Sequence, residues 1–449
     1  MKAKRWLAVF TAAAVTMGMA TGCGKDTSET GGGTDNQKES TVEEEGVSEL
    51  AGTKISFLNS KGEIQSALED MAITFEEETG IAVDIMACGT GEVPYTKITS
   101  AYNSGAAPTM AMLDTTDIVA LAEEYAIDLS EENWVKECED QITRVNDKIY
   151  SFPFCVEGRG LIYNKKAIEN TLGTDFDPES INSYDTLKEL LENLRTAGME
   201  NPVVLSKEDW SLGAHQLGYI YDTYDGTTEG SAEVIKKLKD GSLKAGDYER
   251  FNQFVDTFDL LMEYNINGND PLGALYEQDP IYLADEEAAI WANGCWAWPN
   301  IEEAGASKED EYGFLSFFLG NDTSDFANTG IQVCATKQVM IDGVQATDTE
   351  IAAAKEFLNW IVYSESGQKM LVEQAALIPA CKNNANVPLD PLGKDIQSKM
   401  VNRHIYSSSF IAPSDHWSVM GAAMQKYLAE ESSRKELAAS LDAYWTSQN

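Results

Sequence analysis

Short apolar runs alternate with longer amphipathic segments early in the chain, and this pattern predicts strands and helices in turn. Strands are predicted at 54–58, 81–86 and 108–113, with a helix before each of the last two. The first helix carries apolar side chains at spacings of four, three and four residues, at Ile64, Leu68, Met71 and Phe75. Gly80 stands where this helix is expected to end. Strands that alternate with helices form parallel sheets, so the pattern indicates an α/β fold class.

The residues that follow these strands are candidate ligand positions. In open parallel sheets, ligands bind beyond the carboxyl ends of the strands. Asn59 and Ser60 follow the first predicted strand, and Asp114 follows the strand over 108–113. We therefore expect these three side chains to face a ligand.

Leucine and aromatic stripes mark helices in the middle of the chain. One helix is predicted over 184–196, with Ser183 as its N-cap, and another over 248–264. The apolar side chains of both stripes are assigned to the core. Three further strands are predicted, at 203–206, 312–318 and 331–335. The C-terminal part of the chain is predicted to be helical, with Trp417 near the start of a helix.

A tryptophan cluster interrupts this pattern. Within the segment from Ala289 to Asn300, tryptophans occupy positions Trp291, Trp296 and Trp298. Asn293 and Gly294 favour a turn at which the backbone can approach a ligand closely. An indole ring offers a flat apolar surface on which a sugar ring can lie. Core packing is the alternative for each ring, since tryptophan is highly buried on average.

Length and charge limit the class of protein. The 449 residues exceed what one ordinary core can organise, and 43% of them are hydrophobic, so two domains or lobes are expected. The 74 acidic residues outnumber the 33 basic ones and give a formal net charge of -41. A surface this acidic repels phosphate backbones, so we expect no nucleic-acid partner.

The first residues have the pattern of an export signal. Basic residues precede an apolar run over 6–20, which is too short to span a membrane, and small residues then lead to Cys23. The Ala-Thr-Gly-Cys sequence there resembles a bacterial lipobox, with Ala20 where such boxes usually carry Leu. We therefore expect a lipoprotein signal peptide over 1–22. The resemblance to a lipobox implies that Cys23 carries a lipid. The polar composition after it predicts a flexible tether, so residues 23–50 are assigned to the lipid-bearing cysteine and this tether.

Six further cysteines are spread along the chain, at Cys88, Cys138, Cys155, Cys295, Cys334 and Cys381. No two of them form a CxxC pair, so the chain has neither a zinc ribbon nor a thioredoxin-like motif. An exported protein can form disulfides, but six cysteines allow many pairings and the sequence does not select one. We expect free, buried cysteines.

Four segments together resemble one protein family: FEEETGI at 75–81, IYSFPFCVEGRGLIYNKK at 149–166, NGCWAWPNI at 293–301 and AKEFLNWIVYSESGQKM at 354–370. In this order, behind a lipoprotein signal, they resemble the family 1 extracellular solute-binding proteins of ABC sugar importers. The chain is similar to maltose- and oligosaccharide-binding proteins over residues 52–449.

The resemblance implies a two-lobed fold of the periplasmic-binding-protein type. Each lobe is expected to contain a mostly parallel sheet wrapped by helices, and a multi-strand hinge is expected to join the lobes. The first lobe is predicted to comprise 51–155 and 330–379. The second lobe is predicted to comprise 156–329 and 380–449.

The resemblance also implies a carbohydrate site between the lobes. Trp296 and Trp417 match two tryptophans that stack on sugar rings, and Trp210 matches an aromatic residue beyond a strand. Glu157 matches a glutamate that accepts hydrogen bonds from hydroxyl groups. The other polar side chains assigned to the ligand are Asp114, Asn59, Ser60, Lys61 and Asn328. The tryptophans assigned to the core are Trp291, Trp298 and Trp360.

The implied function is capture without chemistry. The protein is expected to hold an oligosaccharide and deliver it to ABC permease subunits that work with a separate ATPase, since no P-loop occurs in this sequence. We expect no cofactor and no metal. We also expect a monomer at the extracellular face of the cell membrane, held there by its lipid anchor alone.

Three alternatives remain open. A glycoside hydrolase needs two carboxylates across the scissile bond, and 74 acidic residues supply such pairs by chance. The chain has no GxSxG, HExxH or GxGxxG motif, and its only histidines are His215, His404 and His416. Within the binding class, the ligand could instead be a peptide, a polyamine or a phosphate ester. A structural surface lipoprotein is the third alternative.

Overall fold

The computed structural model describes residues 48–89, 92–407 and 410–448, which belong to one compact unit. The expected signal peptide, the lipid-bearing Cys23 and nearly all of the tether lie outside the described residues. Within the described ranges, no helix combines the length and the apolar character needed to cross a bilayer.

Three parallel strands from the start of the chain form one end of a sheet. β1 (Lys54–Asn59) lies between β2 (Ala82–Ala87) and β3 (Met110–Asp114) and pairs with both in parallel. These strands confirm the three that the hydrophobic pattern predicts in this region. The part of the molecule around them is called the first lobe below.

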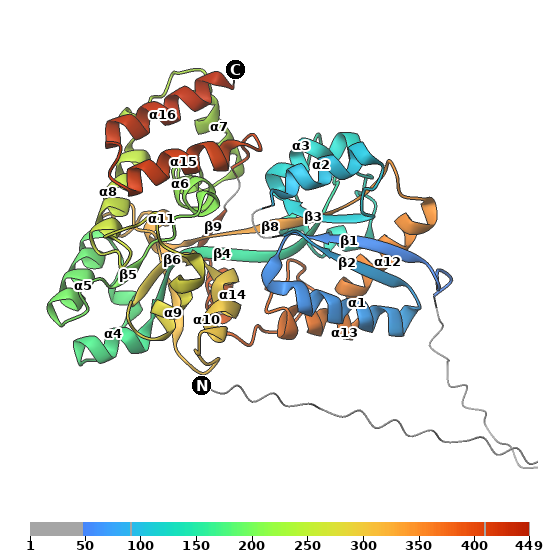
Figure 1. Ribbon diagram of the computed structural model, residues 1–449, viewed down its shortest axis with the longest axis horizontal. Helices are drawn as coiled ribbons and strands as arrows, with labels where there is room; N and C mark the ends of the chain where they lie inside the picture. The colour runs from blue at the N-terminus through green and yellow to red at the C-terminus, as the bar shows by residue number, and fades with distance from the viewer. Residues whose placement is uncertain (1–47, 90–91, 408–409, 449) are drawn as a thin grey trace, which may run out of the picture. The chain divides into compact units, whose positions relative to one another are not determined.

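Two long strands carry the sheet away from the first lobe. β8 (Ile331–Ile341) pairs antiparallel with β3, and β4 (Phe152–Asn164) pairs antiparallel with β8. Figure 1 shows both strands running from one group of helices to the other. We call β4 and β8 the crossing strands.

The remaining strands surround the far ends of the crossing strands and belong to the second lobe. They are β5 (Val203–Val204), β6 (Ile290–Gly294), β7 (Tyr312–Leu315) and β9 (Ile405–Ser407). The main path of the sheet has the order β2-β1-β3-β8-β4-β6-β5. The two-lobed α/β fold is therefore confirmed. The sheet as a whole is mixed rather than mostly parallel, because β4 runs antiparallel to β6, β7 and β8.

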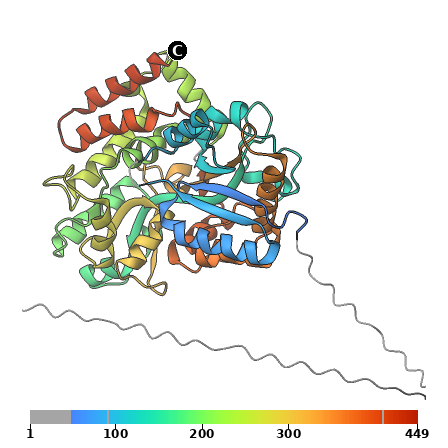
Figure 2. The same cartoon turned by 45° about the vertical axis from the view of Figure 1, so that its right-hand side comes forward.

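The core of the first lobe packs between the sheet and helices from both halves of the sequence. Phe357 on α12 (Asp348–Tyr363) meets Phe57 on β1 and Phe75 on α1 (Gln65–Thr79), with ring centroids 6.1 and 5.0 Å apart. Figures 1 and 2 both show the late helices, in orange, beside the blue start of the chain. The other helices of this lobe are α2 (Pro94–Ser104), α3 (Thr115–Tyr125) and α13 (Glu365–Lys369).

The predicted end of α1 is confirmed. Gly80 adopts a φ of 78°, the left-handed conformation that glycine tolerates, and its N–H closes the last turn on Glu76. The apolar face is confirmed as well, since Leu68, Met71 and Phe75 are all buried.

The second lobe has a larger, mainly helical core. α5 (Tyr184–Thr196) buries its four leucines, and Ser183 forms the predicted N-cap as part of a capping box. α8 (Glu249–Glu263) buries its aromatic stripe as predicted. The other helices here are α4 (Lys165–Leu172), α6 (Leu217–Asp222), α7 (Thr228–Lys239), α9 (Asp279–Ala284), α10 (Trp298–Glu303), α11 (Phe326–Thr329), α14 (Pro391–Val401), α15 (His416–Leu428) and α16 (Arg434–Ser447).

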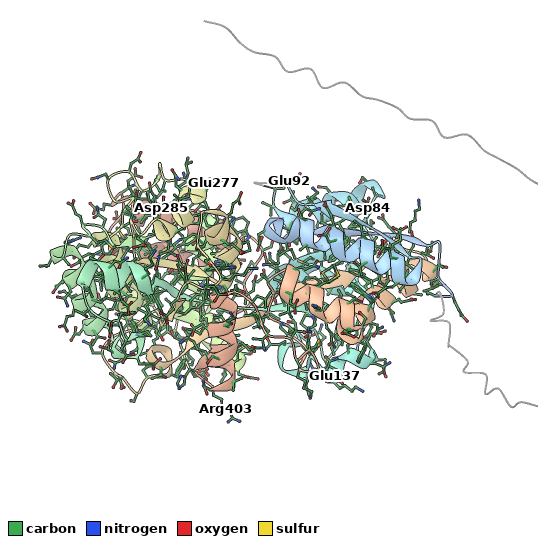
Figure 3. The ribbon with its side chains drawn as sticks, turned by 90° about the horizontal axis from the view of Figure 1, so that it is seen from below. Asp84, Glu92, Glu137, Glu277, Asp285 and Arg403 are labelled. Carbon is green, nitrogen blue, oxygen red and sulfur yellow. A yellow bond between two sulfur atoms is a disulfide. The ribbon has the colours of Figure 1, made fainter. Side chains whose placement is uncertain are left out.

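Acidic side chains project from the surface of both lobes. Figure 3 shows Asp84 and Glu92 on the first lobe and Glu277 and Asp285 on the second, and all four are exposed. Exposed carboxylates of this kind favour solubility.

The expectation that the cysteines are free is wrong for two of the six. Cys138 and Cys381 form a disulfide across 243 residues of sequence. Cys88, Cys155, Cys295 and Cys334 are free thiols. Both bonded cysteines are buried in the core of the first lobe, although the predicted boundary assigns Cys381 to the second. The fold brings the two sulfurs together, and no local spacing in the sequence signals it.

Candidate ligand-binding site

Eight tryptophans lie in the described part of the chain, and their burial divides them into two groups. Five are buried, namely Trp134, Trp291, Trp298, Trp360 and Trp445. The assignment of Trp291, Trp298 and Trp360 to the core is thus confirmed. The other three are only partly buried, namely Trp210, Trp296 and Trp417. These partly buried rings are the three that the sequence assigns to the ligand.

A π-helical segment, Ser211–Gln216, determines how Trp210 meets its neighbour His215. Two residues five positions apart lie about 140° from each other around an α-helix, on different faces. The wider i→i+5 turn of a π-helix reduces this angle. The two rings consequently pack edge to face, with centroids 5.3 Å apart. Single π turns of this kind occur frequently at functional sites.

Trp296 lies in the turn that follows β6 and also packs against His215. The two ring centroids are 4.7 Å apart and the planes are tilted by 53°. Gly294 is required for this arrangement, because a Cβ atom at that position would lie 2.1 Å from the indole ring of Trp296. His215 is therefore in contact with both indole rings.

Tyr276 extends this group of rings. Its ring centroid lies 5.4 Å from that of Trp210, and its hydroxyl accepts a hydrogen bond from Nδ2 of Asn293 at 3.2 Å. We call Trp210, His215, Tyr276 and Trp296 the aromatic cluster. All four side chains are partly buried.

Trp417 reaches the same region because α15 lies directly on the π-helical segment. A Cβ atom on Gly213 would lie 2.1 Å from the carbonyl oxygen of Trp417. A Cβ atom on Gly421 would lie 2.4 Å from the carbonyl oxygen of Asp209. Only glycines allow the two backbones to approach this closely. The close approach places the start of α15, which carries Trp417, next to the segment that carries His215.

A buried group of charged side chains joins the loop after β1 to the middle of β4. Nζ of Lys61 lies 2.5 Å from a carboxylate oxygen of Glu157 and 2.7 Å from one of Glu63. Burial by itself lowers the pKa of Lys61, but the charges of Glu157 and Glu63 outweigh it and hold the pKa well above its ordinary value. Lys61 therefore stays ionised and paired.

A second charged group forms where β3 meets β8. Asp114 pairs in register with Lys337, and their side chains form an ion pair of 2.8 Å. The pKa of nearby Asp117 is raised to about 7, mainly by burial and secondly by the charge of Asp114, while the charge of Lys337 opposes the rise. Among the described residues, no set of three or more acidic, histidine or cysteine side chains is arranged to hold a metal ion.

The charged groups act electrostatically on two rings of the aromatic cluster, His215 and Tyr276. Burial lowers the pKa of His215 well below its ordinary value. Three positive charges lower it further, those of Arg159, Lys337 and Lys61. Burial raises the pKa of Tyr276, and the charge of Glu63 adds to the rise. Charges from the first lobe and the crossing strands therefore act on rings of the second lobe.

Comparison with known proteins identifies the family. Residues 70–399 match the family described as bacterial extracellular solute-binding proteins. The chain belongs to this family. Its relatives bind solutes and are not enzymes.

Two kinds of relative resemble this solute-binding protein. The multiple sugar-binding protein of Streptococcus mutans serotype c is 27% identical over 255 residues, and the match spans 56% of each protein, about half of that relative's length. The solved structure of SBP RafE in complex with raffinose has a TM-score of 0.71 at 18% identity, covering 88% of this chain and 99% of that one. A chitin oligosaccharide binding protein has a TM-score of 0.69 at 17% identity, covering 88% and 98%. These two structural likenesses show the same fold.

Asn59 and Asn328, which the sequence assigns to the ligand, form hydrogen bonds within the protein's own loops. The Asn59 side chain accepts a hydrogen bond from the Lys61 N–H and donates to the Lys61 carbonyl, both at 2.8 Å. Asn328 accepts from the Leu319 N–H at 2.6 Å and donates to the Asp322 carbonyl at 3.0 Å. Both side chains are buried. In this solute-binding protein they hold the loops that frame the site.

Ser60 differs from these asparagines. Its hydroxyl oxygen is enclosed but forms no hydrogen bond within the described part of the chain. A buried hydroxyl usually has a partner, so a ligand hydroxyl or an ordered water would complete its bonding.

The sequence interpretation missed three residues of this site, namely His215, Tyr276 and Lys337. His215 stands in a stretch without a regular apolar period, and Tyr276 follows turn residues over 267–273 that by themselves indicate no ligand contact. Lys337 meets Asp114 only through the antiparallel register of β3 and β8. Nothing in either segment alone indicates that register.

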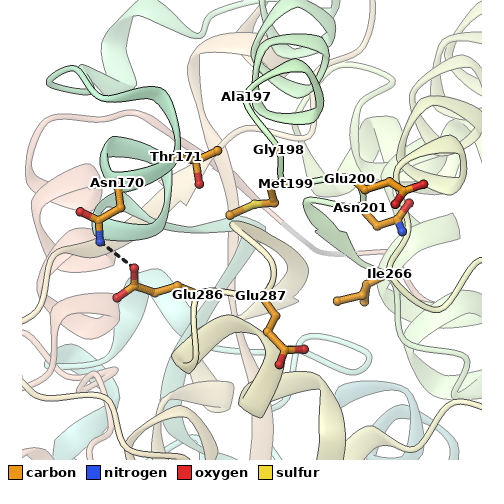
Figure 4. Close-up of a pocket in the computed structure, with 10 residues that line it drawn as sticks. All are labelled: Asn170, Thr171, Ala197, Gly198, Met199, Glu200, Asn201, Ile266, Glu286 and Glu287. Carbon is orange, nitrogen blue, oxygen red and sulfur yellow. Dashed lines mark hydrogen bonds between the residues drawn. The ribbon is translucent and has the colours of Figure 1, made fainter.

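A separate cavity of about 520 Å³ lies elsewhere on the second lobe (Figure 4). Asn170, Met199, Glu200 and Glu287 line it, and Asn170 donates a hydrogen bond of 2.7 Å to Glu286 at its edge. None of the side chains assigned to the ligand lines this cavity. A smaller cavity of about 320 Å³ in the first lobe, lined by Glu132, Lys136 and Arg144 among others, also lacks them.

Proposed function

We propose that this solute-binding protein captures an uncharged oligosaccharide between its lobes and presents it to an ABC importer. The observation that carries the proposal is the position of the partly buried tryptophans. Trp210, Trp296 and Trp417 lie on neighbouring elements of the second lobe, and the charges of Lys61 and Lys337 act on His215 of the aromatic cluster.

The chemistry of this arrangement suits a sugar. The C–H faces of a pyranose can stack on indole rings, and each aromatic contact adds ~0.5–1.5 kcal/mol beyond the burial of area. Hydroxyl groups can bond to Glu157 and Asp114, and a hydrogen bond to a charged group contributes ~1.5–3 kcal/mol. A few such contacts reach the ~8 kcal/mol that corresponds to micromolar affinity.

The pairing of charges favours an uncharged ligand over the alternatives. Each cation near the aromatic cluster has a carboxylate partner: Lys61 has Glu157 and Glu63, Lys337 has Asp114, and Arg159 has Asp222 at 3.9 Å. A phosphate ester would have to compete with these carboxylates. A polyamine would meet the cations themselves. A neutral, hydroxyl-rich ligand disturbs neither set of pairs.

The relatives support the same ligand class. One carries the name multiple sugar-binding protein, and two solved structures of this fold concern raffinose and chitin oligosaccharide. Because the proposed contacts come from both lobes, the ligand binds the closed form better and shifts the population toward it. Closure is then the signal that the permease reads.

The finer parts of the proposal concern location and partners. The lipobox-like sequence at Cys23 supports lipid anchoring at the extracellular face of the membrane. Permease subunits and their separate ATPase perform transport, while this chain acts as a monomer without catalysis. The ligand site comprises Trp296, Trp417, Trp210, Glu157, Asp114, Lys61 and Ser60, with Asn59 and Asn328 bracing its loops.

A thermal-shift screen tests this function. The probes are raffinose and chitin oligosaccharides on one side, and spermidine, short peptides and sugar phosphates on the other. At a hundredfold excess over Kd, a ligand stabilises the folded form by about 2.7 kcal/mol. We expect an increased unfolding midpoint with at least one neutral oligosaccharide and with none of the charged probes. An increase with spermidine or a sugar phosphate alone would replace the proposal.

A further inference from the structure

The three histidines of the chain occupy three different environments. His416 is buried, and its Nε2 lies 2.8 Å from the Tyr221 hydroxyl, so it has the bonding of a core residue. His404 is exposed. His215 is partly buried between two indole rings, and neither of its ring nitrogens forms a hydrogen bond with the residues that the structure describes.

Among the described residues, the ring nitrogens of His215 are not enclosed polar atoms without a partner, so they stay open to solvent while the ring packs against the indoles. Such an open donor and acceptor is available to a ligand. The π-helical segment that holds His215 in this place is itself less common than a regular helix turn. A leucine or phenylalanine would fill the same space between the indoles without a polar group. The imidazole is therefore the feature that packing alone does not explain.

We propose that His215 is a specificity-determining binding residue, which exchanges a hydrogen bond with a hydroxyl of the sugar that stacks on Trp296. The inference rests on the proposed function and adds a named polar contact to it. The ring lies 4.7 Å from the Trp296 ring, centroid to centroid, so it reaches the rim of a pyranose lying on that indole. That rim is where the hydroxyl groups of a sugar are found.

The charged surroundings keep the imidazole neutral and suited to this role. Burial lowers its pKa, and the surrounding cations are Arg159 on β4, Lys337 on β8 and Lys61 beyond β1. A neutral imidazole has one donor nitrogen and one acceptor nitrogen, and a hydroxyl can pair with either. A sugar that carries a free hydroxyl at this point is therefore preferred over its deoxy or O-methyl analogue.

Titration calorimetry on the full chain tests the inference. The ligand is the neutral oligosaccharide that gives the largest thermal shift. His215→Phe keeps a ring between the indoles and removes both nitrogens, so we expect about tenfold weaker binding, the equivalent of one hydrogen bond. His215→Asn and His215→Gln restore an amide near Nδ1 or Nε2, and we expect one of them to bind within about threefold of the wild type. The matched control is His404→Phe, for which no change is expected.

Nitrogen NMR of the imidazoles gives a second readout. Adding the oligosaccharide should shift a ring nitrogen of His215 and leave those of His404 and His416 unchanged. Wild-type affinity in His215→Phe, together with an unshifted His215 signal, would overturn the inference while leaving sugar binding intact. If His215→Phe does not fold, the NMR shift and the two amide variants decide. If the wild type binds no oligosaccharide, the proposed function fails and this inference fails with it.

Discussion

At the scale of single residues, the backbone beside a tryptophan determines whether its ring packs in a core or stays partly open. Trp291 stands inside β6 and packs in the core, where its Nε1 donates a hydrogen bond of 3.0 Å to Ser206. Trp296 follows Gly294, which permits close contact with the indole. The turn that the sequence predicts at Asn293-Gly294 is wrong, because both residues belong to β6 and Gly294 is extended, with a φ of -125°. The chain turns just after them, at Cys295–Ala297. The contact between Trp210 and His215 could not be predicted, since it depends on a π turn that has no periodic signature.

The hydroxyl of Ser206 also donates a hydrogen bond of 2.6 Å to Asp279, a buried carboxyl group. Burial raises the pKa of Asp279 from its ordinary value of 3.8 to about 7, although the Ser206 bond opposes the rise. The folded protein therefore binds more protons here than the unfolded chain does between about pH 4 and pH 7. In this window the contribution of Asp279 to stability falls as the pH rises.

Asp279→Asn should remove this dependence, because an amide does not titrate. Between pH 5 and pH 7, the unfolding free energy of the wild type should fall more steeply with pH than that of the variant. The expected difference in slope is roughly 1 kcal/mol per pH unit. Urea denaturation at both pH values measures it. Asp285→Asn, at an exposed position, is the control and should follow the wild type. The same pH dependence in Asp279→Asn and the wild type would show that Asp279 titrates normally.

At the scale of elements, the site depends on one close packing of two backbones. α15 lies on the π-helical segment because Gly213 and Gly421 have no side chains at the contact. Neither glycine stands in a turn motif, so no sequence pattern connects them. The helix that carries Trp417 was predicted, but its position on the segment that carries His215 was not.

Gly213→Ala should separate these elements, because the new Cβ would lie 2.1 Å from the Trp417 carbonyl oxygen. We expect a stability loss of about 1–3 kcal/mol, typical of overpacking, together with weaker oligosaccharide binding as Trp417 moves. Thermal unfolding and calorimetry measure the two effects. Gly246→Ala is the matched control, since its nearest neighbour beyond the adjoining chain is 4.0 Å away. Wild-type affinity and stability in Gly213→Ala would mean that the contact is not tight in solution.

The disulfide between Cys138 and Cys381 joins two segments of the first lobe. Its residues are 243 positions apart, so no local pattern could predict the pairing. The cross-link restricts the unfolded chain over a long loop, and such links typically stabilise proteins by ~2–4 kcal/mol.

Replacing both bonded cysteines by serine should therefore lower the free energy of unfolding by about 2–4 kcal/mol. Urea denaturation of the double variant checks this, and dithiothreitol should lower the wild-type midpoint in the same direction. Cys88→Ser, which removes a free thiol, is the control. A wild-type midpoint that does not respond to dithiothreitol would show that the bond does not form or does not stabilise.

At the scale of the whole molecule, alternating strands and helices predicted the α/β class and the strands of the first lobe correctly. The antiparallel pairing of β4 with β8 was not predicted, because a fully buried strand carries no alternation from which direction or register can be inferred. Those two strands connect the lobes, so the chain could be divided into lobes only by resemblance. The boundaries at 155/156, 329/330 and 379/380 stay predictions.

Closure of the lobes around a ligand should make the molecule more compact. Small-angle scattering from the full chain, with and without a saturating oligosaccharide, is expected to show a smaller radius of gyration in the bound state. The same sugar added to Trp296→Ala is the control and should produce a smaller change at the same concentration. Superimposable profiles for free and saturated wild type would exclude closure as the signal to a permease.

The most direct measurement is the affinity of Trp296→Ala for the oligosaccharide that best stabilises the wild type. Tyr363→Ala, which removes an exposed ring from the first lobe, is its control. If an indole in the aromatic cluster carries the sugar, calorimetry will show at least tenfold weaker binding in Trp296→Ala, an unchanged unfolding midpoint without ligand, and wild-type binding in Tyr363→Ala. Equal affinities in all three proteins would contradict the account.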